Sequence, residues 1–348
     1  MSAIEEKIKQ AQKILVIDLL YLGDLLFATP FIRNLRASFP EARIEMVVNS
    51  NFIDIIDNNP HLDRVIPYDK RFTVLESIRF ARELKSNEYD LGINIHGNWR
   101  TALLLRLISP DISAGFGTRG RGFFLDKALT PAEDRHMVQV YLEVLDDLGL
   151  ALKAGDYPEI VVEDRARTRV NNLLQAKGID PEDSLIALNT GGSWPTKRWP
   201  EASFARLADR LISERGIKVI FPGGNGDKDR ITRIFELMKE QAVDLSGETT
   251  LRELAALFEN CRLVISGDSG PAHVAAATGT PVICLFGPSD EEKFRPYASQ
   301  VEVVSNDLPC RPCGEHECPR DHHLCLEGIG VQDILQVMRR SDRIDTRR

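Results

Sequence analysis

Short apolar runs alternate with amphipathic stretches along almost the whole chain. Residues 13–18 (KILVID) are nearly all apolar, and so short a run is typical of a strand buried on both faces of a sheet. The expected strands are 13–18, 43–48, 64–67, 91–95, 185–189, 217–221, 263–266 and 282–286. The expected helices are 4–12, 29–38, 75–85, 103–108, 136–148, 166–177, 201–215, 229–240, 250–259 and 272–278. Strands that alternate with helices in this way predict an α/β protein with parallel sheets covered on both faces.

The alternation lapses between Gly149 and Asp164, in a stretch that contains Pro and Gly, and then restarts. We therefore expect a first Rossmann-like domain over residues 1–160, a second over 161–330, and a C-terminal helix or tail over 331–348. Ligands of such sheets lie beyond the carboxyl ends of the strands. Two facing domains of this kind would hold two substrates in the cleft between them.

Composition narrows the class of protein. A chain of 348 residues is too long for one ordinary core. Its 44 Lys and Arg against 52 Asp and Glu leave a net charge of -8, which gives no overall attraction to nucleic acid. The N-terminus lacks the apolar segment of a signal peptide, and no stretch approaches the ~20 apolar residues of a membrane span. With six cysteines and no export signal, we expect a cytoplasmic protein with reduced thiols.

The stretch 263–288 (LVISGDSGPAHVAAATGTPVICLFGP) predicts a strand, a tight turn, a helix of small residues and a second strand. The turn would place Ser269 and the N-H groups of a helix N-terminus where an anionic phosphate could bind. Asp268 would repel a phosphate there. We therefore expect Asp268 to cap the helix, to accept from a sugar hydroxyl, or to orient His273.

A second candidate loop, residues 189–200 (NTGGSWPTKRWP), leaves the first strand of the second domain. Thr190, Gly191 and Gly192 would let a ligand approach the backbone, and Lys197 and Arg198 add positive charge. This combination indicates a diphosphate clamp. The alternative is a glycine turn with solvated basic side chains. A further glycine-rich loop, 222–226, is a weaker signal of the same kind.

The first domain offers candidates for proton transfer and acceptor binding. The turn after strand 13–18 holds one glycine, Gly23, and not the G-x-G-x-x-G of a dinucleotide site, which weighs against an NAD or FAD enzyme. Asp24 follows it and could act as a general base, or could merely complement a helix dipole. His96 is a rival base or a structural histidine. The side chains that would suit an anionic acceptor are those of His96, Arg100, Arg119 and Arg121, although the arginines could equally be ordinary exposed ones.

A group of four cysteines, Cys310, Cys313, Cys318 and Cys325, lies near the C-terminus. Its opening C-x2-C fits a zinc knuckle, whereas the later spacings fit no standard tetrahedral pattern. A structural zinc is one interpretation. A packed loop of reduced thiols or a disulfide is the other.

Four segments together resemble a known family. They are KILVIDLLYLGDLLFATPFIRNLRASFP, TGGSWPTKRWPEASFARLADRL, SGDSGPAHVAAATGTPVICLFGPSD and CRPCGEHECP. In this order, over nearly the whole chain, they resemble glycosyltransferase family 9, the lipopolysaccharide heptosyltransferases. The resemblance implies a GT-B fold with two Rossmann-like domains and the donor bound by the C-terminal one. It also implies transfer of heptose from ADP-L-glycero-D-manno-heptose to the inner core of lipopolysaccharide, with inversion and no obligatory metal.

The resemblance also implies residue roles. Asp24 matches the family's proposed base, and Lys197 matches the lysine that contacts the donor phosphate. The donor motif falls on Asp268, Ser269, Gly270 and His273, and Thr190 with Gly191 matches the first donor loop. This chain reads Gly-Pro-Ala between Ser269 and His273, where members often have a larger residue after the glycine.

Three alternatives remain at the level of sequence. A glycosyltransferase of the same fold could use another sugar nucleotide, a nucleotide-sugar epimerase could use two similar domains, and a non-catalytic protein could bind a nucleotide sugar.

The chain also ends in arginines. That tail is compatible with peripheral contact at the inner face of the inner membrane, or with a frayed, solvated terminus.

Overall fold

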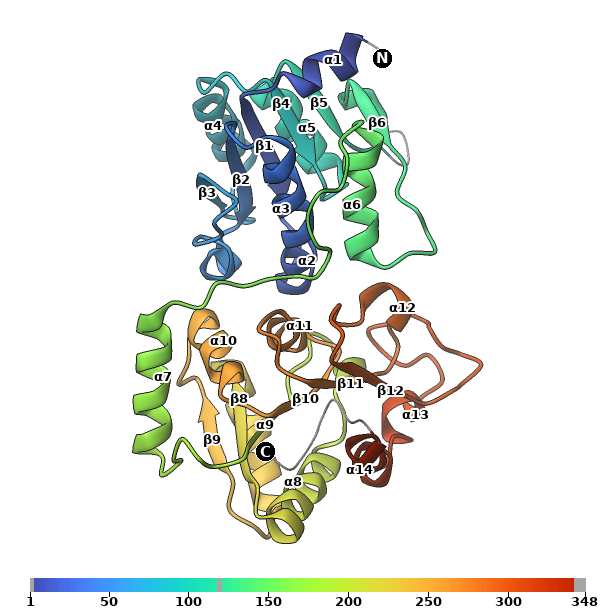
Figure 1. Cartoon of the computed structure of the whole chain (residues 1–348). Coiled ribbons are helices and arrows are strands. Elements are labelled where there is room, and N and C mark those ends of the chain that lie inside the picture. Colours follow the sequence, from blue (N-terminus) through green and yellow to red (C-terminus); the bar gives the residue numbers. More distant parts are fainter. Residues whose placement is uncertain (1–2, 118–120, 341–348) are drawn as a thin grey trace. The chain divides into compact units, whose positions relative to one another are not determined.

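The computed structural model describes residues 3–117 and 121–340, and it divides the chain into two compact units. The first runs up to Val161 and the second starts at Val162 (Figure 1). Within the described residues each unit builds one six-stranded sheet, in the orders β3-β2-β1-β4-β5-β6 and β12-β11-β10-β7-β8-β9. Every neighbouring pair of strands is parallel. The α/β class predicted from the hydrophobic pattern is confirmed.

The first unit contains the strands β1 (Lys13–Asp18), β2 (Arg43–Asn49), β3 (Arg64–Tyr68), β4 (Leu91–Asn94), β5 (Ile112–Phe116) and β6 (Lys127–Leu129). Its helices are α1 (Ala3–Lys9), α2 (Leu22–Phe27), α3 (Thr29–Ser38), α4 (Val74–Lys85), α5 (Trp99–Ile108) and α6 (Met137–Asp147), with 3-10 turns η1 (Ser50–Ile55) and η2 (Arg121–Phe124). The sequence pattern missed β5 and β6. In β5, Gly115 has a φ of +151°, and a side chain there would lie 2.3 Å from the carbonyl oxygen of Asn94. The close pairing of β5 with β4 therefore requires a glycine at position 115. That same glycine made the segment resemble a loop in the sequence.

The second unit contains the strands β7 (Leu185–Asn189), β8 (Lys218–Gly223), β9 (Val243–Ser246), β10 (Leu263–Gly267), β11 (Val282–Phe286) and β12 (Val301–Ser305). Its helices are α7 (Asp164–Ala176), α8 (Glu201–Arg215), α9 (Lys228–Leu237), α10 (Leu251–Glu259), α11 (Gly270–Ala277), α12 (Glu291–Phe294), α13 (Leu324–Glu327) and α14 (Val331–Arg340), with turns η3 (Pro195–Lys197) and η4 (Asn225–Asp227). The pattern missed β9 and β12, which form the two edges of this sheet. Edge strands are short and partly exposed, so they lack a continuous apolar run.

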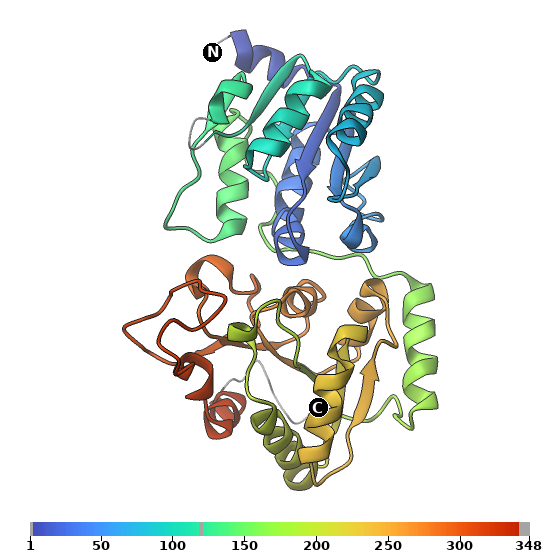
Figure 2. The same cartoon turned by 180° about the vertical axis from the view of Figure 1, so that it is seen from behind.

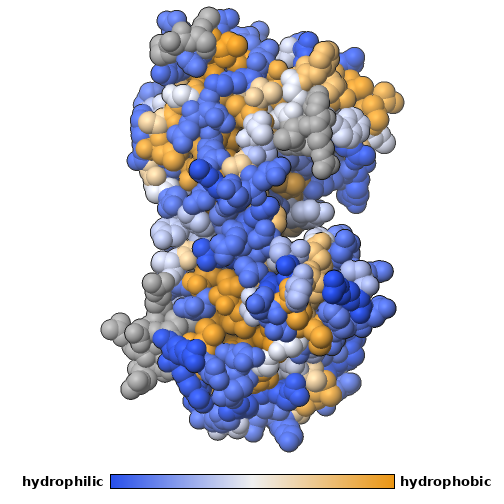
Figure 3. Space-filling view, turned by 90° about the vertical axis from the view of Figure 1, so that its right-hand side faces the viewer, coloured by the Kyte–Doolittle hydropathy of each residue, from blue (hydrophilic) through white to orange (hydrophobic). Residues whose placement is uncertain are grey.

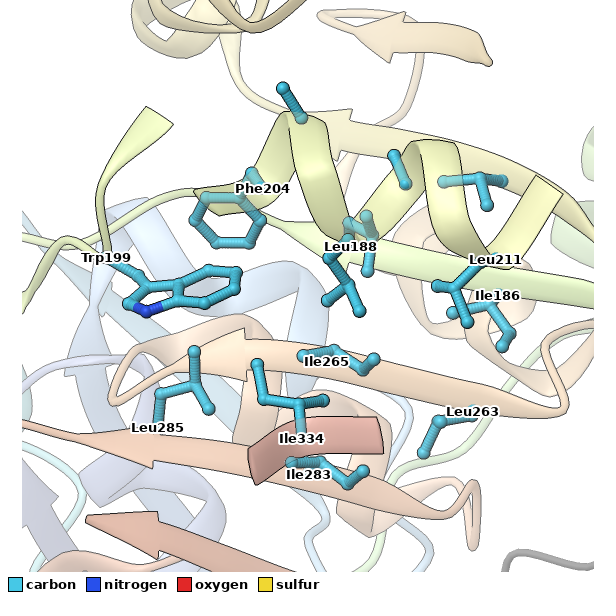
Figure 4. Close-up of a cluster of buried hydrophobic side chains, with 14 of the residues drawn as sticks. Ile186, Leu188, Trp199, Phe204, Leu211, Leu263, Ile265, Ile283, Leu285 and Ile334 are labelled. Carbon is cyan, nitrogen blue, oxygen red and sulfur yellow. The ribbon is translucent and has the colours of Figure 1, made fainter. Parts of the chain in front are cut away.

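The core of the second unit lies between its sheet and the helices α8 and α14 (Figure 4). The ring of Trp199 meets that of Phe204 edge to face, with centroids 4.9 Å apart. Its indole N-H donates to the carbonyl of Ile329 at 3.0 Å. This core anchors the start of α8, and with it the end of the loop that leaves β7.

Helices cover both faces of each sheet, as the views from the front and from behind show (Figures 1 and 2). The face drawn in Figure 3 is largely hydrophilic, with apolar residues gathered in patches on each unit. No helix within residues 3–117 and 121–340 is long and apolar enough to cross a membrane.

Candidate active site

A pocket of about 440 Å³ opens at the carboxyl edge of the second sheet. Its walls come from the loops after β7, β8, β9 and β10, which meet there because parallel strands end at the same edge. The lining residues are Asn189, Gly191, Gly192, Ser193, Gly223, Gly224, Asp227, Thr249, Thr250, Leu251, Leu254, Ser269, Gly270 and Pro271. Two glycine-rich loops and a helix start thus enclose one cavity with a few polar groups.

Side-chain hydrogen bonds join the loop after β7 to the turn after β10. The amide of Asn189 donates to the hydroxyls of Ser266 at 2.8 Å and Ser269 at 3.0 Å. The two serine hydroxyls are 3.1 Å apart. The two predicted donor loops are therefore held against each other by buried polar contacts, with Asn189 as the common donor.

Lys197 and Asp268 form an ion pair beside this pocket. The Nζ atom of Lys197 is 2.6 Å from Oδ2 of Asp268, and their side chains are 17% and 6% exposed. Lys197 also lies 4.4 Å from the ring centroid of Trp194, which stacks on His316 at a centroid distance of 3.8 Å. The carboxylate that was expected to repel phosphate is neutralised by this lysine.

Helix α11 starts at the pocket wall. Ser269 is its N-cap residue and Pro271 lies in its first turn. Asp268 therefore does not cap the helix, contrary to one expectation. The first N-H groups of a helix have no partner within it and carry partial positive charge. With Gly270 on the pocket wall, these groups can bind an anion there.

The predicted donor residues take different positions around this cavity. Gly191, Ser269 and Gly270 line it, whereas Thr190 and His273 are buried behind it with 2% and 7% exposure. Sequence reasoning included Asn189 in a candidate loop without a role of its own, and it missed Asp227 and the wall formed by Thr249, Thr250, Leu251 and Leu254. The Thr250 capping box with Glu253 was a readable signal for a helix start, but nothing local tied it to the other loops.

The first unit presents a turn, residues 18–24, at the carboxyl end of β1. Three consecutive backbone N-H groups each donate to a titratable side chain. They are Leu19 to Nδ1 of His96 at 3.1 Å, Leu20 to Oδ1 of Asp18 at 2.9 Å, and Tyr21 to Oδ2 of Asp24 at 3.3 Å. Asp24 lies in the first turn of α2. One backbone turn thus positions two carboxyl groups and an imidazole.

His96 is poorly suited to be the base. Its Nδ1 atom already accepts from the N-H of Leu19, and its Nε2 atom contacts the amide of Asn98. Burial, with a smaller contribution from the charge of Lys70, lowers the pKa of His96 to about 4. The imidazole is therefore neutral at pH 7, and both of its nitrogen atoms already have partners. Asp24 stays the predicted base.

The predicted acceptor arginines are only partly described. Arg100 lies in the first turn of α5, with its guanidinium carbon 5.6 Å from the ring centroid of Trp99. Arg119 and the side chain of Arg121 lie outside the described residues. A role for these residues in acceptor binding stays a prediction.

The zinc interpretation of the cysteine cluster is not supported. Within residues 3–117 and 121–340, no group of three or more His, Cys, Asp or Glu side chains is arranged to hold a metal ion. Cys310, Cys313, Cys318 and Cys325 are all free thiols. The intervening histidines serve packing instead. His316 stacks on Trp194, and Nε2 of His323 lies 2.8 Å from the carbonyl oxygen of Thr196.

Comparison with solved structures identifies the fold class of this chain. The chain is 28% identical to a solved structure of a glycosyl transferase family 9 protein from Veillonella parvula DSM 2008, with a TM-score of 0.86 and coverage of 94% and 96% of the two chains. The fold also matches the structure of E. coli ADP-heptose lps heptosyltransferase II, with a TM-score of 0.79, 23% identity and coverage of 94% and 97%. Two doubly wound units with this similarity define a GT-B glycosyltransferase, as predicted.

The sequence comparisons identify the family. A model described as glycosyltransferase family 9 (heptosyltransferase) matches residues 77–324. The chain is also 31% identical over 332 residues to lipopolysaccharide heptosyltransferase 3 of Escherichia coli (strain K12), covering 90% of this chain and 94% of that protein. This chain belongs to glycosyltransferase family 9. It is therefore a glycosyltransferase, and not an epimerase or a non-catalytic binding protein.

Proposed function

We propose that this enzyme transfers heptose from ADP-L-glycero-D-manno-heptose to the inner core of lipopolysaccharide, with inversion at the anomeric carbon. The observation that carries the proposal is the pocket at the carboxyl edge of the second sheet, with the Lys197–Asp268 ion pair beside it. The names of the similar proteins support the sugar and the acceptor, since these are an ADP-heptose enzyme and a lipopolysaccharide heptosyltransferase.

The pocket suits a nucleoside diphosphate. Its volume of about 440 Å³ lies within the usual range for small-molecule sites. Leu251 and Leu254 supply an apolar wall for a nucleobase, and the Asp227 carboxylate can accept from ribose hydroxyls. The diphosphate would then lie toward Gly191 and the start of α11. Thr190 and His273 would support the loops that hold it.

The acceptor would be activated by Asp24. In this mechanism the Asp24 carboxylate takes the proton of an acceptor hydroxyl while that oxygen attacks the anomeric carbon. The bond between that carbon and the β-phosphate oxygen breaks, and both electrons leave with ADP. Lys197 and the N-H groups at the start of α11 stabilise the departing charge. Because a single displacement occurs, the anomeric centre is inverted.

A metal ion is not required by this scheme, since Lys197 and the helix N-terminus supply the positive charge at the diphosphate.

We place the reaction on the cytoplasmic side of the inner membrane, where a peripheral contact would bring the enzyme to its acceptor. The first unit would bind that acceptor through His96 and Arg100, and the second unit would bind the donor.

The decisive experiment on the base replaces Asp24 by Asn. We expect turnover to fall ~10²-fold to 10⁴-fold with donor affinity nearly unchanged, because the amide cannot take a proton but leaves the donor pocket intact. Asp126→Asn is the matched control, since that carboxylate accepts from the N-H of Ser113 in the same unit and should leave turnover unchanged. Wild-type turnover in Asp24→Asn would remove Asp24 from this role.

The substrate assignment is tested with a panel of ADP- and UDP-sugars, each offered with truncated lipopolysaccharide acceptors and read by mass shift. We expect transfer from ADP-heptose to an inner-core acceptor, with the same yield in excess EDTA. Transfer only from another nucleotide sugar would replace the proposed donor while keeping the enzyme class.

A further inference from the structure

A buried polar cluster lies at the carboxyl ends of β1 and β4, in the same turn region as Asp24. Its members are Asp18 at the end of β1, Asn94 at the end of β4 and Tyr141 on α6, and each residue is at most 1% exposed. Ile17 and Asn94 are register partners, which places Asn94 next to Asp18. The Asp18 Oδ2 atom, both amide atoms of Asn94 and the Tyr141 hydroxyl make no hydrogen bond within the described part of the chain.

Such a cluster is unusual for a purely structural core, because buried polar atoms are normally paired. One carboxylate oxygen of Asp18 is satisfied by the N-H of Leu20, which fixes the orientation of the carboxyl group. The other oxygen, Oδ2, is buried and accepts no hydrogen bond within the described residues. The cluster therefore holds a carboxyl group with one hydrogen-bonded oxygen and one unpaired oxygen, and the unpaired oxygen can carry a proton.

The charged and titratable groups that face Asp18 come from four elements. They are Asp24 on α2, Lys70 after β3, His96 after β4 and Tyr141 on α6. Burial is the main cause that raises the pKa of Asp18 to about 7, and the negative charge of Asp24 raises it further. The hydrogen bond from the Leu20 N-H and the positive charge of Lys70 act in the opposite direction. The pKa of His96 is about 4 and that of Tyr141 is well above its usual value, so among these three groups only Asp18 has a pKa near neutrality.

We propose that Asp18 is a positioning residue that sets the basicity of Asp24. While Asp18 holds its proton, it places no negative charge beside Asp24. When Asp18 releases that proton to solvent, its negative charge makes protonation of Asp24 more favourable. A carboxylate with higher proton affinity is a better general base for a sugar hydroxyl. This inference rests on the proposed role of Asp24 and adds a second carboxyl group that acts through it.

The test is the pH dependence of turnover in wild type and in Asp18→Asn, between about pH 5 and pH 9 at saturating donor and acceptor. The substitution keeps an oxygen that can accept from the N-H of Leu20 and removes only the ionisation. We expect wild-type kcat to rise about 3-fold to 10-fold through neutral pH, and Asp18→Asn to stay at the lower level with an unchanged donor KM. Asp126→Asn should keep the wild-type rise.

A purely structural Asp18 would give a different result. Asp18→Asn would then keep the wild-type pH profile or lose donor binding and turnover at every pH in parallel, and either outcome overturns the proposal. If Asp24→Asn retains wild-type turnover, the proposed base and this inference both fail. If Asp24→Asn is inactive and Asp18→Asn has the wild-type profile, only this inference fails.

A second measurement does not depend on activity. Infrared spectra of the Asp24→Asn variant should show a protonated carboxyl group that ionises near neutral pH, and the Asp18→Asn, Asp24→Asn double variant should lack it. Absence of that band from the single variant overturns the proposal, even if Asp18→Asn alone proves too unstable for kinetics.

Discussion

In the proposed donor site, Lys197 would have two opposing tasks. It neutralises Asp268, which is 5% exposed, and it would contact the donor diphosphate. An isolated carboxylate at this depth is unfavourable and would repel phosphate. A buried Asp268 carboxylate next to a bound phosphate is therefore tolerated only while Lys197 is present. The two residues act as one unit.

We therefore expect Lys197→Ala to weaken ADP binding by about 10²-fold and to lower kcat as well, since Asp268 would be left unpaired beside the diphosphate. Isothermal titration with ADP and steady-state kinetics measure the two effects. Lys218→Ala, at the amino end of β8, is the matched control and should change neither. The double variant with Asp268→Asn should recover part of the affinity. Unchanged ADP affinity in Lys197→Ala would contradict the clamp.

Asp18 makes stability depend on pH in a direction opposite to that of most aspartates. Its pKa is about 7 in the folded protein and 3.8 ordinarily, so the folded state binds its proton more tightly. This contribution is fully present below about pH 4 and is lost as pH rises to about 7. At ~1.4 kcal/mol per pKa unit, the loss is a few kcal/mol.

The expected result is that Asp18→Asn is more stable than wild type at pH 8, with a smaller difference at pH 5. Urea unfolding monitored at both pH values measures it. Asp126→Asn serves as control, because hydrogen bonds to Ser113 lower the pKa of Asp126, and its effect should not change between these pH values. A difference between Asp18→Asn and wild type that is equal at both pH values would contradict the raised pKa.

At the scale of elements, the proposed donor site depends on how closely β10 and its turn approach the loop after β7. Gly267 ends β10, and a side chain there would lie 2.8 Å from the backbone oxygen of Lys197. That oxygen belongs to the η3 turn, which is fixed by the burial of Thr196 and Trp199. The two donor loops therefore leave no room for a methyl group between them.

Gly267→Ala should accordingly shift the loop that carries Lys197 and raise the donor KM about 10-fold, with a stability loss of about 1–3 kcal/mol. Kinetics and thermal unfolding measure the two consequences. Gly226→Ala is the control, because a side chain at Gly226 meets nothing within 4 Å. A Gly267→Ala enzyme with wild-type donor KM would show that the contact is not limiting.

At the scale of the whole molecule, the two units are built as separate folding blocks. Each has its own six-stranded sheet within the described residues. The second unit has its own core around Trp199, and the first has one around Leu15, Ile17 and Leu105. All residues that line the proposed donor pocket belong to the second unit.

A chain cut to residues 162–340 should therefore fold and bind ADP with an affinity within about 10-fold of the full enzyme, since donor contacts come from this unit alone. It should catalyse no transfer, because it lacks Asp24. Circular dichroism and calorimetry measure folding and binding. The matched fragment 3–161 should fold without binding ADP. A folded 162–340 fragment with no affinity for ADP would move the donor site elsewhere.

Local sequence determined the central strands and the motifs of this protein. The strands β1, β7, β10 and β11 are continuous apolar runs because they are buried on both faces, and that burial is visible residue by residue. The glycine turns after β7 and β10 likewise marked two loops that line one pocket. These features depend on neighbours in the chain, so a single sequence suffices to predict them.

Only the tertiary structure decided which distant groups meet. The pairing of Lys197 with Asp268 arises because β7 and β10 are adjacent in the sheet, and no local pattern encodes that order. The edge strands β9 and β12 lacked a full apolar run, and Asp18 resembled the polar end of an ordinary strand. Its raised pKa comes mainly from burial, in an environment to which segments far apart along the chain contribute.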